Sequence, residues 1–158
     1  MEEKLYTYLE AQGITFACYE HEPAFTCDQM GTIKKHLPEH GGIKNLFLKD
    51  KKKRYYLLSA SYDTKVDLKT LAKEWEAPDL RFARPDELEA ILGVKPGSVT
   101  PFALLHDSER KVSVFFDKKM FSYTQIGLHP LRNDKTLLLA PADVEKFVAS
   151  LGYELRLL

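Results

Sequence analysis

The chain has 158 residues, of which 44% are hydrophobic and 29% are charged, and its 23 basic and 23 acidic side chains give a net charge of zero. This length suits one domain with a substantial core, so we expect a single domain over residues 1–158. Zero net charge argues against a protein that coats long nucleic acids, but it leaves room for one that grips the end of an RNA.

Membrane and metal signals are weak in this sequence. No apolar run is long enough to span a bilayer, and the N-terminus does not read as a signal peptide, so we expect a cytoplasmic protein without a membrane partner. Cys18 and Cys27 fit no metal-binding spacing and should be free thiols. His36 and His40 match the H-x-x-E-H string of certain zinc peptidases, but Pro38 would break the helix that this motif needs. We therefore expect no metal and no cofactor.

The first forty residues predict two helices separated by a short strand. Apolar spacing indicates a helix over residues 2–12 that ends at Gly13, and a strand follows at 15–20. After a loop, Thr26 to Gln29 fits a capping box, which predicts a second helix to about Lys35.

Residues 41–50 predict a buried strand with one lysine near its entrance. Strand side chains alternate between faces, so Lys44 should share a face with Leu46 and Leu48, while Asn45 points to the other face. A charge on an apolar face is costly unless it is paired or meets an anionic ligand. The strand alone leaves two interpretations open, a lysine that reaches water at the strand end and a lysine at the mouth of a pocket.

A basic turn follows this strand. Residues 55–59 should return as the second strand of a hairpin, and the turn is rich in basic side chains: Lys49, Lys51, Lys52, Lys53 and Arg54. Such a run is either a solvated turn or a contact for phosphate groups.

Three more helices are expected in the rest of the chain. Asp67 should cap a helix that runs to Trp75. Pro85 opens the next helix, which ends at Gly93, and the last helix spans residues 141–151.

The remaining predicted strands are short and cover residues 80–83, 102–106, 111–117, 136–139 and 153–157. Helices and strands are interleaved, yet several connections are hairpins that are too short for parallel crossovers. We therefore predict an α/β fold of the α+β type, with a mixed, largely antiparallel sheet and helices packed around it.

Two loops carry candidate chemistry. Residues 97–101 form a loop that is bounded by prolines and begins with a glycine, and such a loop can present backbone N–H groups to an anion or a developing oxyanion. Ser98 lies outside any G-x-S-x-G elbow, and no acidic partner is evident beside His129, so a serine hydrolase is not indicated. Because His129 precedes a proline, it should be extended or in a turn.

Four segments occur in the chain in this order: EHEPAFT at 20–26, KNLFLKDKKKRYYLL at 44–58, GVKPGSVTPFALLHD at 93–107 and GLHP at 127–130. In this order and spacing they resemble the YbaK/ProX family of aminoacyl-tRNA deacylases, and in particular its freestanding prolyl-tRNA editing branch, the PrdX or ProXp-ala type. The resemblance implies a curved, partly barrel-like sheet.

The resemblance also implies a function. It implies a hydrolase that cleaves the ester between a misattached amino acid, alanine in the nearest branch, and the terminal adenosine of tRNA(Pro). The implied partner is the acceptor end of tRNA(Pro), and prolyl-tRNA synthetase is a further candidate partner. The alternatives are a deacylase for another small aminoacyl group, such as cysteine on tRNA(Pro), and a non-catalytic module that binds tRNA or a synthetase.

The resemblance assigns two sets of site residues. The catalytic set is Lys44, Gly97, Ser98 and His129, and the substrate-binding set is Phe25, Thr26, Asn45, Val99, Pro101 and Asn133. A separate hydrolytic site makes physical sense, because one methylene gives a synthetase only about 1–3 kcal/mol of discrimination. An aminoacyl ester is already activated, so positioning, an oxyanion site and an oriented water can suffice without a protein nucleophile.

Overall fold

The computed structural model describes residues 2–25 and 27–158. Within that part of the chain, no helix is both long and apolar enough to cross a membrane. The helices are α1 (Glu2–Ala11), α2 (Cys27–Lys34), α3 (Leu68–Glu74), α4 (Pro85–Leu92) and α5 (Pro141–Ser150), with short 3-10 helices η1 (Pro101–His106) and η2 (Lys118–Ser122).

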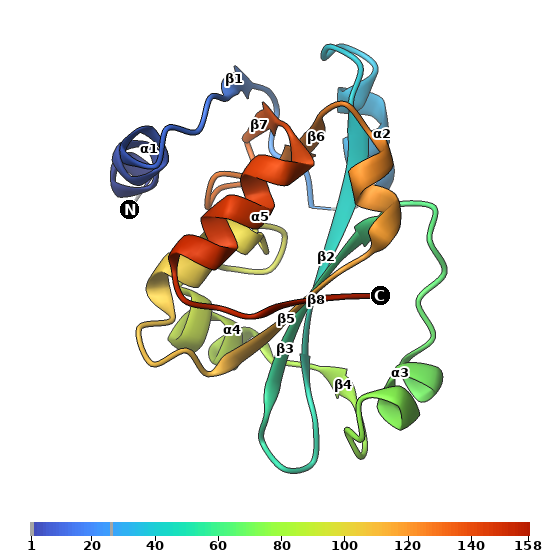
Figure 1. Cartoon of the computed structure of the whole chain (residues 1–158). Helices are drawn as coiled ribbons and strands as arrows, with labels where there is room; N and C mark the ends of the chain where they lie inside the picture. The colour runs from blue at the N-terminus through green and yellow to red at the C-terminus, as the bar shows by residue number, and fades with distance from the viewer. Residues whose placement is uncertain (1, 26) are drawn as a thin grey trace.

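The strands form one open mixed sheet (Figure 1). They are β1 (Ala17–Glu20), β2 (Gly41–Lys49), β3 (Tyr55–Ser61), β4 (Arg81–Phe82), β5 (Val112–Phe116), β6 (Ile126–Leu128), β7 (Lys135–Leu139) and β8 (Leu155–Leu157). Their order is β1-β7-β6-β2-β3-β5-β8, and β4 pairs with β2 beside this path. Since β1 and β8 end the order, the sheet does not close into a barrel.

Antiparallel pairing dominates, as the sequence predicted. Among the described residues, β1–β7, β6–β7, β2–β3 and β2–β4 are antiparallel, whereas β2–β6, β3–β5 and β5–β8 are parallel. The prediction of a mixed α/β fold with a largely antiparallel sheet is confirmed.

The sheet carries a separate apolar cluster on each face. The larger one joins Phe47 and Leu57 to helices α1, α4 and α5, and the smaller one joins Leu48 and Leu58 to α3. Successive residues of β2 thus point to different clusters, which confirms the predicted alternation. Figure 1 shows α2 near the start of β2 and α3 near β4, toward its other end. The start of β2 is therefore left for α2 and neighbouring loops to cover.

Several local predictions are confirmed by the caps. Asp67 caps α3 with its carboxylate accepting a hydrogen bond from the N–H of Lys69 at 3.0 Å. Gly93 ends α4 in the left-handed conformation with φ of 67°, where its missing side chain avoids strain.

The predicted strand at residues 102–106 is wrong, because these residues form the 3-10 helix η1. Thr100 caps it by accepting from the N–H of Phe102 at 3.3 Å, and Pro101 occupies its first turn with a φ suited to a helix. Phe102, Ala103 and Leu104 are all buried, so these successive apolar residues show no period that distinguishes a strand from a helix. Strand β6 and helix η2 are additions that the sequence did not indicate.

Candidate active site

Two glycines on neighbouring parallel strands form the floor of the candidate site. Gly42 of β2 pairs with Gly127 of β6, and paired residues in a parallel ladder point to the same face. Lys44 comes two positions after Gly42 within β2, so the alternation of strand side chains places it on that face. His129 comes two positions after Gly127 and directly after the end of β6. The pairing of the two glycines therefore brings the segments that lead to Lys44 and His129 side by side.

Side chains crowd around this floor. A Cβ atom on Gly127 would lie 2.8 Å from Cδ2 of His40, so only glycine fits there. A Cβ atom on Gly42 would lie 3.4 Å from Cδ1 of Tyr62 and 3.6 Å from Cε of Lys34. The floor is thus bordered by His40, Tyr62 and Lys34.

His129 is held in one tautomer by its backbone contact. Its Nδ1 lies 2.9 Å from the carbonyl oxygen of Lys135, which can only accept, so Nδ1 carries the proton. In the neutral ring, Nε2 then has its lone pair free to accept a hydrogen bond. Burial lowers the pKa of His129, and the nearby ring of His21 lowers it further, which outweighs the bond to Lys135.

His21 supports this arrangement from the loop after β1. Its ring centroid lies 6.1 Å from that of His129. Nδ1 of His21 donates to the carbonyl oxygen of Glu22 at 2.7 Å, and Nε2 meets Oγ1 of Thr136 at 2.8 Å. Both ring nitrogens of His21 are therefore engaged, and its ring forms a fixed wall beside His129.

Lys44 is anchored through a chain of hydrogen bonds. Its Nζ donates to the carbonyl oxygen of Thr64, and Oγ1 of Thr64 donates to Asp117 at 2.5 Å. Asp117 is buried and also accepts from the N–H groups of Ser61 and Lys119, each at 3.1 Å. Among the residues that the structure describes, Lys44 has no carboxylate partner. An ammonium has three donors, so a positioned cation keeps N–H groups for an anionic or carbonyl ligand.

The proline-bounded loop begins with a type II β-turn. Ser98 donates its N–H to the carbonyl oxygen of Lys95 at 3.0 Å, with Pro96 and Gly97 at the two central positions. Gly97 has φ of 91°, as the third residue of this turn requires. The N–H of Ser98 is therefore occupied within the turn. The N–H groups of Gly97 and Val99 have no acceptor among the described residues.

The turn lies against the loop between β1 and α2. A Cβ atom on Gly97 would lie 3.5 Å from Cδ1 of Phe25, whose side chain is 67% exposed. Ala24, the residue before Phe25, donates its N–H to the carbonyl oxygen of Asn133 at 3.0 Å. The structure therefore gathers Phe25, Gly97 and Asn133 along one loop. Thr26 lies outside the described residues.

Two other expected site residues lie apart from this surface. Asn45 belongs to the opposite face from Lys44, and its Oδ1 accepts from Oγ of Ser59 at 2.6 Å. Pro101 is buried in the first turn of η1. Within the described part of the chain, no group of three or more histidine, cysteine or acidic side chains is placed to hold a metal ion, and α2 ends before His36. Cys18 is an exposed free thiol.

Several residues of the site escaped the sequence reasoning. His21 stood within a quoted motif but was not selected, and Tyr62, Thr64 and Asp117 were not noticed. Thr64 and Asp117 are 53 positions apart, so only strand pairing brings them together. The signal that could have pointed to them is a polar residue soon after each of two adjacent strands, since Asp117 directly follows β5 and Thr64 comes three residues after the end of β3.

Similarity to known proteins covers the part of the chain that holds these residues. The family model described as the aminoacyl-tRNA editing domain matches residues 21–147, a range that contains every candidate residue named above. The chain belongs to the aminoacyl-tRNA editing family. It is accordingly an aminoacyl-tRNA deacylase, a hydrolase of the ester that links an amino acid to tRNA.

Individual relatives agree over nearly the whole chain. The Prolyl-tRNA editing protein ProX of Acetoanaerobium sticklandii is 37% identical over 145 residues, 91% of this chain and 88% of the relative. The Prolyl-tRNA synthetase associated domain-containing protein 1 of Danio rerio is 36% identical over 152 residues, 94% of this chain and 81% of the relative. A solved structure described as a candidate trans-editing enzyme for prolyl tRNA synthetase has a similar fold, with a TM-score of 0.73, 21% identity and coverage of 98% of this chain and 93% of that one.

Proposed function

We propose that the chain removes misattached amino acids from tRNA(Pro), with alanine as the preferred amino acid, and that it acts on the acceptor end in trans to prolyl-tRNA synthetase. The observation that carries the proposal is the pairing of Gly42 with Gly127, which brings the segments that carry Lys44 and His129 side by side. Lys44 offers a positioned cation that pairs with none of the described carboxylates, and His129 offers a neutral acceptor nitrogen. The name of the Acetoanaerobium sticklandii relative supports tRNA(Pro) as the substrate.

In the proposed mechanism, Lys44 binds the terminal phosphate or the ester carbonyl and fixes the ester over the glycine floor. Water adds to the carbonyl carbon, helped by the vicinal hydroxyl of the terminal ribose. The N–H groups of Gly97 and Val99 stabilise the oxyanion. The bond to the ribose oxygen then breaks, that oxygen leaves as a hydroxyl, and the products are a free amino acid and uncharged tRNA. Asn133 and the loop of Phe25 and Thr26 line the amino-acid pocket in this proposal.

The selectivity test is a panel of charged tRNAs. The purified protein is mixed with alanyl-, cysteinyl-, seryl- and prolyl-tRNA(Pro), and ester loss is followed over time. We expect fast loss of alanine and little loss of proline, because a small pocket excludes the larger ring sterically. Faster loss of cysteine or serine would reassign the amino acid. No acceleration over buffer with any of the four would favour a non-catalytic binding module.

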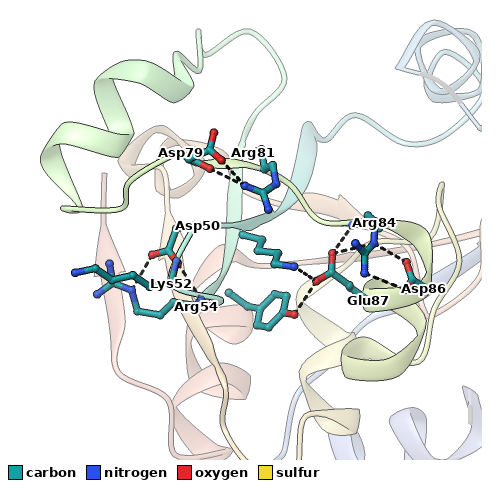
Figure 2. A network of polar contacts seen from close by, with 10 residues as sticks. Asp50, Lys52, Arg54, Asp79, Arg81, Arg84, Asp86 and Glu87 are labelled. Atoms are coloured by element: carbon teal, nitrogen blue, oxygen red, sulfur yellow. Dashed lines mark hydrogen bonds and ion pairs between the residues drawn. The ribbon is translucent and has the colours of Figure 1, made fainter.

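We expect the basic turn between β2 and β3 to contact phosphates of the acceptor stem through only three of its five basic residues. Lys49 is buried against Glu87 at 2.5 Å, and Arg54 binds Asp50 at 2.7 Å, as Figure 2 shows for the labelled Asp50, Arg54 and Glu87. The other three side chains, Lys51, Lys52 and Lys53, are exposed at the tip. The tip is about 20 Å along the strand from Lys44, so it would meet the stem and not the ester.

Replacing Lys51, Lys52 and Lys53 by serine should therefore weaken tRNA binding and flatten its salt dependence. Each lost phosphate contact lowers the slope of log affinity against log salt by about 0.9. Affinity titrations at several salt concentrations measure the slope. Serine at Lys4 and Lys146, exposed lysines of α1 and α5, serves as the control. An unchanged slope in the triple variant would indicate that the turn is solvated and makes no phosphate contact.

His129 should contribute a moderate part of the rate. Replacing it by alanine should lower kcat by about tenfold, because one oriented neutral hydrogen bond is lost. Since burial lowers the pKa of His129, its acceptor form persists below pH 6.5, and activity should fall only at more acidic pH. A pH profile of kcat measures this. The fall in kcat at acidic pH should be absent in the alanine variant. An identical fall in both proteins would contradict the proposed role of His129.

A further inference from the structure

Tyr62 is an exposed aromatic side chain at the edge of the candidate active site. It directly follows β3, and 62% of its surface is exposed. A Cβ atom on Gly42 would lie in contact range of both the Tyr62 ring and the Lys34 side chain. Among the described residues, the ring of Tyr62 pairs with no other aromatic ring. Its exposed apolar face therefore contributes little to the core.

The turn that carries Tyr62 is nevertheless held firmly. Tyr62 donates its N–H to the carbonyl oxygen of Gly42 at 2.9 Å. On either side of it, the N–H of Ser61 and Oγ1 of Thr64 both bind Asp117, at 3.1 and 2.5 Å. Oγ of Ser61 also meets the hydroxyl of Tyr123 at 2.7 Å. An aromatic ring on a fixed backbone loses little conformational entropy when it contacts a ligand.

The charges around Tyr62 suit an anionic ligand. Lys34 approaches the same point above Gly42, and Lys44 is held by the carbonyl of Thr64, two residues after Tyr62. Lys34 has no acidic partner among the described side chains. The one carboxylate on the turn, Asp63, is already paired with Lys119 at 2.5 Å. The surface thus combines an aromatic face with two cations that form no ion pair with the acidic side chains the structure describes.

We propose that Tyr62 is a stacking site for one unpaired base at the 3′ end of the tRNA, with Lys34 contacting the adjacent phosphate. Proteins bind single-stranded nucleic acid with aromatic platforms and neighbouring cations, because every base has a flat face and every nucleotide a phosphate. An apolar peptide would cover the ring but leave the cations unpaired. The proposal rests on the proposed function, since it assigns the base to the same RNA end whose ester Lys44 would bind.

The test uses a local probe of stacking. An uncharged acceptor-stem minihelix carries 2-aminopurine in place of one unpaired 3′ base at a time, and the fluorescence of 2-aminopurine falls when it stacks. We expect one labelled position to be quenched by the wild-type protein and by Tyr62→Phe. In Tyr62→Leu the quenching should disappear, and affinity should fall by about fivefold to a hundredfold, the usual range for one lost base–aromatic stack.

Phe82 provides a matched control. It is 59% exposed, but it lies on β4 and pairs with Leu48 near the far end of β2. Phe82→Leu should leave both quenching and affinity unchanged. Thermal unfolding of each variant checks that the fold is intact, which is expected because Tyr62 is largely exposed.

The outcomes separate the two proposals. Quenching that persists in Tyr62→Leu, or that is lost only in Phe25→Leu, would overturn the stacking site. If no charged tRNA is hydrolysed while quenching still requires Tyr62, the deacylation proposal fails and the stacking site stands. Hydrolysis that is intact with no quenching at any labelled position would reject the stacking site alone.

Discussion

Replacing Lys44 by alanine should lower ester hydrolysis by about 10²–10³-fold, the usual effect of removing one preorganised group that stabilises developing charge. The structure supports a large effect because the ammonium is fixed by Thr64, whose own position depends on buried Asp117. Since Lys44 is only half-buried and forms no ion pair with a described residue, its loss should leave stability almost unchanged. Single-turnover rates with alanyl-tRNA(Pro) measure the change.

Two variants sharpen this prediction. Lys69→Ala is the control, because it removes an exposed lysine of α3 and should keep full activity. Lys44→Arg separates two roles, because guanidinium binds phosphate well but differs in shape and reach from an ammonium. Retained activity in Lys44→Arg would favour phosphate binding, and loss would favour close contact with the carbonyl. A Lys44→Ala protein as fast as wild type would rule out the assigned role.

The second large effect concerns stability and the buried pair of Lys49 and Glu87. Glu87→Gln should lower the free energy of unfolding at neutral pH by about 3 kcal/mol, because it leaves a buried ammonium without its counter-charge. The two side chains are only 11% and 9% exposed. Glu87 also accepts from the hydroxyl of Tyr55 at 2.8 Å and from the N–H of Arg84 at 3.0 Å, so it joins the β2–β3 hairpin to α4 (Figure 2).

The same pair predicts a pH dependence. Burial alone would raise the pKa of Glu87, but the hydrogen bonds from Lys49, Arg84 and Tyr55 outweigh it and hold the pKa at about 2, against an ordinary 4.5. A carboxyl group whose folded pKa is lowered stabilises the protein above its unfolded pKa, and this contribution is lost as the pH falls through the folded value. The difference between wild type and Glu87→Gln should thus be full above pH 4.5 and should shrink toward pH 2.

Urea unfolding at a series of pH values measures this difference. Asp86→Asn is the matched control, since Asp86 is the neighbouring residue and is 71% exposed in its pair with Arg84. An exposed pair of this kind contributes little, about 0–1 kcal/mol. A Glu87→Gln protein as stable as Asp86→Asn at neutral pH would contradict the importance of the buried pair.

Local chemistry determined much of the fold from the sequence alone. The caps at Asp67 and Gly93 and the alternation along β2 depend on residues close in the chain, and all three were predicted correctly. The prediction at 102–106 failed because its first three residues are all buried, which removes the period that separates a strand from a helix. The extent of the domain over residues 1–158 stays a prediction.

The candidate site likewise depended partly on the sequence and partly on tertiary contacts. The sequence by itself pointed to Lys44, the glycine–proline loop and His129, but only through a resemblance, since each is an ordinary residue alone. Only the tertiary structure decided that Gly42 and Gly127 pair, which brings the segments that carry Lys44 and His129 side by side. It also decided that Thr64 and Asp117 meet and hold the lysine. The physical reason is that these contacts depend on strand register between distant segments, which no local pattern of residues encodes.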